Sequence, residues 1–292
     1  MNAPQELLRP LLAPPQASAP VQARIAFSKA PSGASYISEQ RVGYPFHLGR
    51  TLKLPDDPKG MAAVYVQSCS GGIFAGQDLQ MYLHAGPDTQ VHVSTGAATV
   101  AHSMLEQSAR QVVSLTAERG ALLEYLPMAT ILFPQAKLHS QVRVNLHPGA
   151  RVMLCDAFCL HTPKDSAGLF DVYRADLEVR CPAGRLLAGD RLALNGQDLL
   201  RQLPGVSHAF QTLATFMLVG QGLPVEALKT ALRNALPTHP NCYLGVSALP
   251  NDCGISLRIM TLDAVSLRSS LHKAWACVRK HLTGVAPRMR RK

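Results

Sequence analysis

The stretch LQMYLHAGPDTQVHVST, residues 79–95, decides the fold class of this chain. Apolar and polar residues alternate on both sides of a turn, with Leu79, Met81 and Leu83 before it and Val91, Val93 and Thr95 after it. Alternation with a period of two is typical of a β-strand that buries one face. Gly86 and Pro87 interrupt the alternation, so the stretch predicts two strands joined by a turn.

The same unit of strand, turn and strand recurs along the chain. The turn glycines are Gly86, Gly120, Gly149 and Gly184, and alternating runs lie on both sides of each. This spacing predicts hairpin-like units in stacked layers, antiparallel or solenoid-like, as in a β-helix or a sandwich. We therefore expect a mainly β fold, with the β stack over residues 25–200.

A smaller α/β section is expected over residues 201–286. Pro224 stands at the first position of a helix predicted over residues 225–236. Asp263 has the side chain of an N-cap for a second, longer helix, which Gly284 ends. Two alternating runs between the helices predict a strand pair, residues 243–249 and 255–262.

The two ends of the chain differ in composition from the single domain expected at residues 25–286. Residues 1–24 are rich in proline and alanine and are expected to be a disordered tail. Residues 287–292 form a basic tail. The formal net charge is +10, but no run of Lys or Arg is interleaved with aromatic residues. We therefore expect no nucleic-acid partner, and the charge fits steering toward an acidic protein.

The cysteines and the hydropathy indicate a cytoplasmic protein. Seven cysteines at irregular spacings do not form the disulfide framework of a small secreted domain. Prolines break the apolar residues of the first 24 positions, so no secretory signal is expected. No segment approaches the roughly 18 apolar residues of a membrane span, so no membrane partner is expected.

No motif of a catalytic centre is apparent. The chain lacks a phosphate loop of the form GxxxxGK[ST]. Residues 71–76 are glycine-rich, but a dinucleotide-binding loop should open a helix, and here a strand-like run follows. We expect no catalytic residues and no tightly bound cofactor.

Cys155, Cys159 and His161, with Asp156 among them, are the best candidates for metal ligands. Positions 155, 159 and 161 share one face if this stretch is a strand. Thiolate and imidazole suit nickel or zinc, which leaves a metal-dependent enzyme as the alternative function. Buried cysteines are more often inert apolar residues, and this spacing matches no standard zinc site, so we favour a structural role.

Three blocks of the sequence resemble the UreD (UreH) family of urease accessory proteins. Residues 71–99, GGIFAGQDLQMYLHAGPDTQVHVSTGAAT, are similar to a family turn that leads through two strands to Thr-x-x-Ala-Thr. Residues 120–154, GALLEYLPMATILFPQAKLHSQVRVNLHPGARVML, resemble a second family block. The third is the C-terminal helix. The motif residues are Gly71, Gly72, Gly76, Asp78, Thr95, Ala98, Thr99, Pro148, Gly149, Arg151, Trp275 and Arg279.

The resemblance implies a β-helix-like stack with two helices and a function in urease maturation, not an enzyme. Such a scaffold binds apo-urease and recruits UreF and, through it, the GTPase UreG for GTP-dependent nickel insertion. The family is thought to pass nickel through an internal channel, so nickel is expected in transit. Asp156 aligns with an acidic family position and is the expected channel-lining residue. Cys155, Cys159 and His161 are further candidates for transient nickel contacts.

The chain also departs from the family pattern at several positions. The family Asp after the third glycine is Gln77 here, and Asp78 follows one place later. The family Gln and Lys of Thr-Gln-x-Ala-Thr-Lys are replaced by Gly96 and Val100. A polar pair after Leu-Pro is Met128-Ala129. These changes suggest a divergent member.

Overall fold

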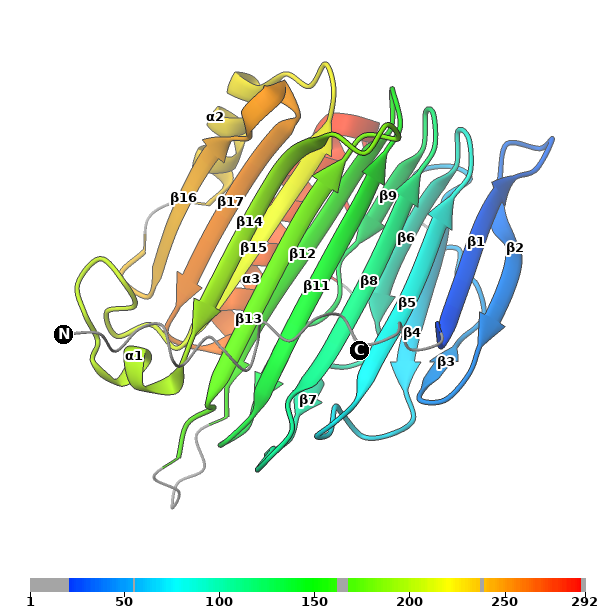
Figure 1. The fold of residues 1–292 in the computed structure, drawn as a ribbon. Helices are drawn as coiled ribbons and strands as arrows, with labels where there is room; N and C mark the ends of the chain where they lie inside the picture. Colours follow the sequence, from blue (N-terminus) through cyan, green and yellow to red (C-terminus); the bar gives the residue numbers. More distant parts are fainter. Residues whose placement is uncertain (1–20, 55, 162–167, 237–238, 290–292) are drawn as a thin grey trace.

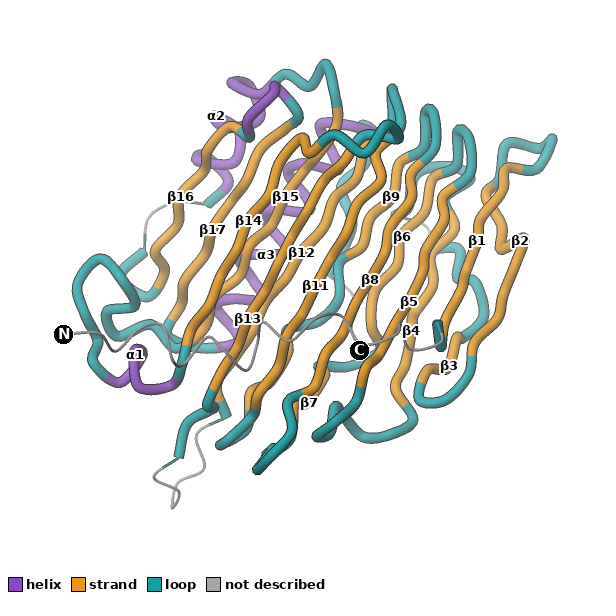
Figure 2. The backbone as a smooth tube through the Cα atoms, in the orientation of Figure 1, coloured by secondary structure: helices purple, strands orange, loops and turns teal. Residues whose placement is uncertain are grey.

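Two β-sheets face each other, and two helices cover the outer face of one of them (Figure 1). The computed structural model describes residues 21–54, 56–161, 168–236 and 239–289. The expected tails at residues 1–24 and 287–292 therefore lie largely outside the described residues. Strands are much more abundant than helices (Figure 2), which confirms the mainly β fold class.

Sheet A has seven strands, and none of the described helices covers its outer face (Figure 1). In spatial order they are β14 (Leu186–Leu194), β13 (Val172–Arg180), β11 (Lys137–Leu146), β8 (Ala109–Ala117), β5 (Asp78–Ala85), β1 (Ala23–Lys29) and β2 (Ser35–Val42).

Sheet B has ten strands and packs against the helices. Its main path is β16 (Cys242–Ala248), β17 (Gly254–Thr261), β15 (Thr212–Gly220), β12 (Arg151–Leu160), β9 (Leu122–Tyr125), β6 (Gln90–Thr95), β4 (Ala62–Ser68) and β3 (Phe46–Leu48). Two short strands, β7 (Thr99–Ala101) and β10 (Thr130–Leu132), extend it beside β12. The helices are α1 (Gly196–Leu200), α2 (Val225–Ala235) and α3 (Ala264–Thr283), with a 3-10 turn at Pro250–Asp252.

The middle of the molecule is a solenoid in which the chain alternates between the sheets. β5, β8 and β11 pair in parallel in sheet A, while β6, β9 and β12 pair in parallel in sheet B. Each strand therefore bonds to the next rung, not to the strand across its turn. Antiparallel pairs occur at the two ends of the stack. The β-helix-like layering is confirmed, with the difference that only Gly184 of the four turn glycines joins a true hairpin, between β13 and β14.

Alternation along each strand explains the register. β5 alternates between half-buried and buried residues over its whole length, and its buried side chains join the core between the sheets. β12 is buried on both faces because sheet A lies on one side and the helices on the other. Val152 and Leu154 point into the sandwich, whereas Met153 and Cys155 pack toward the helices.

In the C-terminal section the two helices and the strand pair form as expected, but β15 was not predicted and joins this section to the rest of sheet B. β16 and β17 make the predicted antiparallel pair, and α2 begins directly after Pro224. The Asp263 side chain accepts a hydrogen bond from the backbone N–H of Ser266 at 2.7 Å, and Gly284 ends α3 in the left-handed conformation. Leu267, Ala274 and Val278 bury the inner face of α3.

A buried charge cluster ties α3 to the solenoid. Glu124 on β9 is fully buried, and it accepts hydrogen bonds from both Arg279 and Trp275 of α3. His92 on β6 lies 2.8 Å from Glu124 and stacks on Trp275, and Arg279 also bonds Asp57 at 2.6 Å. The two family-motif residues of the last helix therefore have a structural role: Arg279 neutralises the buried carboxylate and Trp275 donates a hydrogen bond to it.

We expect Arg279→Ala to lower the free energy of unfolding by about 3–5 kcal/mol, because it leaves the Glu124 carboxylate buried without its cation. Denaturant unfolding measures this value. Arg233→Ala is the matched control, since Arg233 is exposed on α2 and a change within about 0.5 kcal/mol is expected there. If both substitutions changed the free energy of unfolding by the same small amount, the buried charge cluster would not stabilise the fold as proposed.

The same cluster predicts how stability depends on pH. Burial by itself raises the pKa of Glu124, but the hydrogen bonds from His92 and Arg279 outweigh it and lower the pKa from 4.5 to about 2. The stabilisation is fully present above about pH 4.5 and is lost as the pH falls toward 2, because the unfolded chain takes up the proton first. The difference in unfolding free energy between wild type and Glu124→Gln should therefore narrow between pH 5 and 3. A constant difference over this range would refute the assignment.

Candidate functional site

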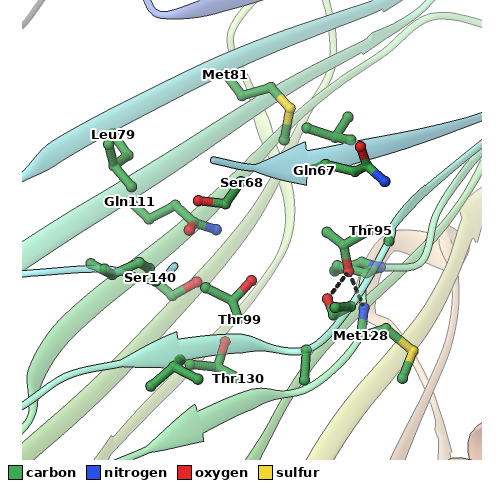
Figure 3. A pocket seen from close by; sticks show the side chains of 18 of the residues that line it. Gln67, Ser68, Leu79, Met81, Thr95, Thr99, Gln111, Met128, Thr130 and Ser140 are labelled. Carbon is green, nitrogen blue, oxygen red and sulfur yellow. Dashed lines mark hydrogen bonds between the residues drawn. The ribbon is translucent and has the colours of Figure 1, made fainter. Parts of the chain in front are cut away.

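A cavity of about 430 Å³ lies between the two sheets (Figure 3). It is at the end of the stack opposite the turns at Gly86, Gly120, Gly149 and Gly184. Sheet A contributes Leu79, Met81, Gln111, Ser140 and Val142, and sheet B contributes Val66, Thr95, Tyr125, Cys155 and Asp156. Exposed residues such as Ser68, Cys69 and Ala97 line the same space, so the cavity extends from the interior to the surface.

The cavity reaches the surface through a gap in sheet B, which we call the window. Three successive rungs are interrupted there: β4 stops at Ser68, residues 96–98 separate β6 from β7, and residues 126–129 separate β9 from β10. β12 runs on without a break beside them. It pairs with β9 up to Leu154 and with β10 from Phe158, so residues 155–157 border the window.

Asp156 is the one charged residue that lines the cavity among the described residues. Its Oδ2 accepts a hydrogen bond of 2.6 Å from the Tyr173 hydroxyl, and its Oδ1 accepts one of 3.2 Å from Ser140. Both donors are neutral and belong to sheet A. Burial raises the pKa of Asp156, and the two hydrogen bonds only partly offset this effect. A positive charge in the cavity would stabilise the carboxylate.

The structure brings most of the sequence-predicted residues of the first family block to this cavity. Gly71, Gly72, Thr95, Ala98 and Thr99 all line it, together with Cys155 and Asp156 of the metal candidates. Thr95 holds two sides of the window together. Its hydroxyl accepts a hydrogen bond from the Met128 N–H at 2.9 Å and donates one to the Ala97 carbonyl at 2.9 Å (Figure 3).

The candidate ligands Cys155, Cys159 and His161 do not form a metal cluster. The two cysteines pack in the apolar layer between sheet B and the helices, while Asp156 points the opposite way. His161 stacks on Phe133, with ring centroids 4.1 Å apart. Among the residues that the structure describes, no group of three or more His, Cys, Asp or Glu side chains is placed to hold a metal ion. Cys155 and Cys159 share one face of β12, which is filled by core packing, whereas His161 lies beyond the end of the strand.

The remaining motif residues shape turns and edges. Gly76 adopts φ +75° where a Cβ would clash with Gln107, and Asp78 pairs with Arg110 at 3.3 Å on the outer face of sheet A. Pro148 and Gly149 make the turn before β12 at the opposite end of the stack from the cavity. Arg151, at the start of β12, borders a separate hollow beside the end of α3.

The positions that depart from the family pattern make the following contacts. The Gln77 side chain accepts a hydrogen bond from the Phe74 N–H at 3.0 Å, so it closes the glycine turn. At Gly96 a Cβ would lie 3.0 Å from the Gln67 side chain. Val100 accepts a bond from the Ile73 N–H at 2.7 Å, Met128 lines the cavity and Ala129 packs on the helix-side core.

Sequence reasoning missed Ser140, Tyr173 and Gln111, although two of them carry a readable signal. Ser140 interrupts the inward-facing series Leu138, Val142, Val144 of β11. Gln111 similarly interrupts the inward-facing series Ala109, Val113, Leu115 of β8. A polar residue at an interior position of the alternation marks a hydrated or functional interior. Tyr173 has no such signal, because a tyrosine is ordinary in a strand.

Comparison with known proteins identifies the family. Residues 19–292 match the family described as UreD urease accessory protein. The chain belongs to this family. It is 76% identical over 270 residues to "Urease accessory protein UreD 1" of Pseudomonas syringae pv. tomato, which covers 92% of this chain and 95% of the relative.

Two further relatives show how far this similarity extends. The chain is 73% identical to the UreD 1 of Pseudomonas syringae pv. syringae, over 95% of this chain and 99% of the relative. It is 32% identical to the UreD 1 of Methylorubrum populi, over 93% of this chain and 92% of the relative. The resemblance inferred from the motifs is thus confirmed over nearly the whole chain. Within the described part of this UreD family member, no helix is both long and apolar enough to span a bilayer.

We expect Cys155 and Cys159 to be unreactive in the folded protein, because burial raises the pKa of both thiols, that of Cys159 to about 11. Iodoacetamide at pH 7.5 should label the exposed Cys69, whereas Cys155 and Cys159 should be labelled only after unfolding. Peptide mass spectrometry measures this difference. If Cys159 were labelled in the folded protein as fast as Cys69, Cys159 would again be a candidate thiolate ligand.

Proposed function

We propose that this chain is a scaffold in urease maturation that binds apo-urease and recruits UreF and, through it, the GTPase UreG. Membership of the UreD family supports this role, and the relatives carry the name of urease accessory proteins. The sequence has no phosphate loop, so the GTP-dependent step belongs to a partner. The broad two-sheet stack offers large surfaces, and assemblies of this kind commonly bury about 2,000 Å² or more.

The proposal includes conduction of nickel through the cavity between the sheets. The observation that supports it is that Asp156 stands alone as a charged group among the lining residues and has only neutral donors. A buried carboxylate without a counter-ion favours the entry of a cation. The hydroxyl and amide side chains around it, including Thr99, Gln111 and Ser140, offer oxygen ligands. A single carboxylate binds weakly, as a transit site must if the ion is to leave again.

We do not favour the alternative of a metal-dependent enzyme, because its candidate ligands Cys155, Cys159 and His161 are not arranged around a common site. Cys155 and Cys159 are protonated thiols in an apolar layer, and His161 is engaged by Phe133. We therefore propose a non-enzymatic role with nickel as cargo and no tightly bound cofactor. The cysteines of the described residues are all free, which fits our proposal of a cytoplasmic location. Protein partners suffice for this function, and we propose neither nucleic acid nor membrane as a partner.

The test replaces Asp156 by Asn in cells that co-express urease with its accessory proteins. We expect unchanged co-purification with the partners but about tenfold or more less nickel per urease active site, since the transit site loses its charge. Metal analysis and urease activity give the two readouts. Asp171→Asn is the matched control, because Asp171 is exposed and pairs with Lys137 at the surface.

Two outcomes would count against the proposal. Normal nickel loading in the Asp156→Asn cells would remove the cavity from the nickel path while leaving the scaffold role intact. Fully nickel-loaded, active urease after deletion of the whole chain would refute the maturation role itself.

A further inference from the structure

The strand β16 forms one edge of sheet B, and Figure 1 shows it as the outermost strand beside α2. Its inner side pairs with β17, and the N–H of Leu249 just beyond it donates to the Gly254 carbonyl at 2.8 Å. Positions that bond to the neighbouring strand alternate with positions that do not in an antiparallel pair. The N–H and C=O groups that point away from β17 therefore belong to Leu244, Val246 and Ala248.

The free part of this edge covers residues 244–248, LGVSA. At the start of β16 the outward N–H of Cys242 donates to the His239 carbonyl at 2.9 Å, so pairing with another strand can begin only after it. Within the described part of the chain, no group bonds to the outward N–H and C=O groups of residues 244–248. Such a row of unpaired backbone groups is a template for a further strand.

The other edge strands have features that prevent this kind of pairing. β2 contains Glu39 and Arg41, and its register with β1 shifts at a bulge. β14 contains Asp190 and Arg191, and its register with β13 shifts in the same way. β3 and β7 are three residues long each. Charges, bulges and short length are the usual means by which proteins protect a sheet edge from other chains.

β16 has none of these protective features. Its seven residues, CYLGVSA, include no charge and no proline, and its register with β17 runs without a shift. An edge that is regular, uncharged and of ordinary strand length pairs with another strand when one is available. The contrast with the other edges indicates that β16 is covered by a strand when the protein is assembled.

We propose that a second copy of this chain covers β16, with the two β16 strands antiparallel about a twofold axis at Val246. The free edge is complementary to itself in this register. Leu244 of one copy faces Ala248 of the other, so a large side chain meets a small one, and Gly245 faces Ser247. No like charges meet, because the stretch has none. The same outward backbone groups are paired on both copies, and the assembly closes at two chains.

The side chains of the edge support this arrangement. Leu244 and Val246 pack on the apolar layer between sheet B and the helices, but both are only half-buried. Their remaining exposed surface lies at the open edge of the sheet. In the dimer the two Val246 side chains lie on the helix side of the joined sheet, so the apolar layer of one copy continues into that of the other. Burial of this surface favours association.

Apolar residues beside β16 enlarge the proposed interface. Tyr243 is 66% exposed, and its ring lies 6.5 Å from that of Phe210 in the loop before β15. The same loop exposes Leu203 and Val206 by 44% and 51%. Stable interfaces commonly bury about 1,200–2,000 Å² in total, which is more than one strand pair supplies. We therefore include this loop and Tyr243 in the proposed contact.

The dimer leaves the cavity accessible. β17, β15 and β12 separate β16 from the window in sheet B. The inference therefore does not depend on the proposed path of nickel, and it goes beyond the proposed function by adding a second scaffold, with its own cavity, to the same assembly.

The first test measures the oligomeric state of the purified full-length chain by sedimentation over a range of micromolar concentrations. We expect a wild-type dimer. Ala248→Lys places an unpaired ammonium group against Leu244 of the other copy, so the dissociation constant of the dimer should rise by about tenfold or more. Ala248→Ser, which adds no charge, should remain a dimer. Tyr36→Lys puts the same charge on the exposed face of β2 and should also remain a dimer.

The second test reads the register. Directly opposed residues of a bonded antiparallel pair have Cα atoms about 5.5 Å apart, which is within the range of a disulfide. Val246→Cys should therefore give a disulfide-linked dimer under mild oxidation, and peptide mass spectrometry should locate the link at position 246. Ser247→Cys is the matched control, because position 247 faces position 245 and not its own copy. It should cross-link much less.

The outcomes decide between a second copy and other occupants of the edge. A wild-type chain that stays monomeric at every concentration would overturn the proposal, and so would a dimer that Ala248→Lys leaves unchanged and Val246→Cys does not cross-link. A monomeric wild type whose binding to a urease accessory protein is lost in Ala248→Lys would show that another protein covers β16, and would also overturn it.

Folding and the proposed function are checked separately. Thermal unfolding shows whether Ala248→Lys keeps the wild-type fold, and if it does not, the Val246→Cys cross-link decides the question. Active, nickel-loaded urease in cells without this chain would refute the maturation role but would not affect the dimer.

Discussion

Backbone hydrogen bonding from one rung to the next is the constraint on which the rest of this structure depends. In the solenoid, each strand bonds to the strand one turn earlier and one turn later in the chain, and each sheet closes one side of the core. The cavity occurs where this pairing is interrupted in sheet B, after β4, between β6 and β7, and between β9 and β10. β12 runs past the gap without a break because it pairs with β15 along its other edge, and it pairs with β9 and β10 on either side of the gap.

Two buried carboxylates in this protein, Glu124 and Asp156, have opposite electrostatic environments. Glu124 is fully buried against Arg279, His92 and Trp275, so its negative charge is neutralised and its pKa is lowered. Asp156 has only the hydroxyls of Tyr173 and Ser140, and its pKa is raised. The first carboxylate fastens a helix to the sheet. The second is left without a positive partner beside an open space, which is the electrostatic condition for attracting a cation.

The positions of these two groups show that the packed part of the fold and the cavity are supported separately. The buried charge cluster around Glu124 lies on the helix side of sheet B. A column of stacked rings, formed by Phe74, His102, Phe133 and His161, lies at the edge of the window. Both features link neighbouring rungs through side chains. The walls of the cavity are therefore held from outside, and its lining is free to carry small and neutral polar residues such as Thr99 and Gln111.

Alternation along the strands was enough to predict the mainly β stack, the turn glycines and the C-terminal strand pair. The caps at Asp263 and Gly284 were also readable, since they depend on local backbone chemistry. Pairing partners were not, because the same alternation suits a hairpin and a solenoid. His84 and His92 illustrate this: a hairpin would place them opposite each other, but they lie in different sheets and bind Glu118 and Glu124 respectively.

The sequence by itself determined the family and the strand periodicity, and it singled out Asp156 as the acidic residue expected to line the interior. Only the tertiary structure decided which face of β12 each residue occupies: Asp156 bonds to sheet A inside the cavity, Cys159 packs in the apolar layer, and Cys155 packs in that layer while it also lines the cavity. It alone also brought Glu124 to Arg279, which is 155 positions away in the chain. The physical reason is that periodicity is a local property, whereas burial and charge pairing depend on which distant rungs and helices come to lie against each strand.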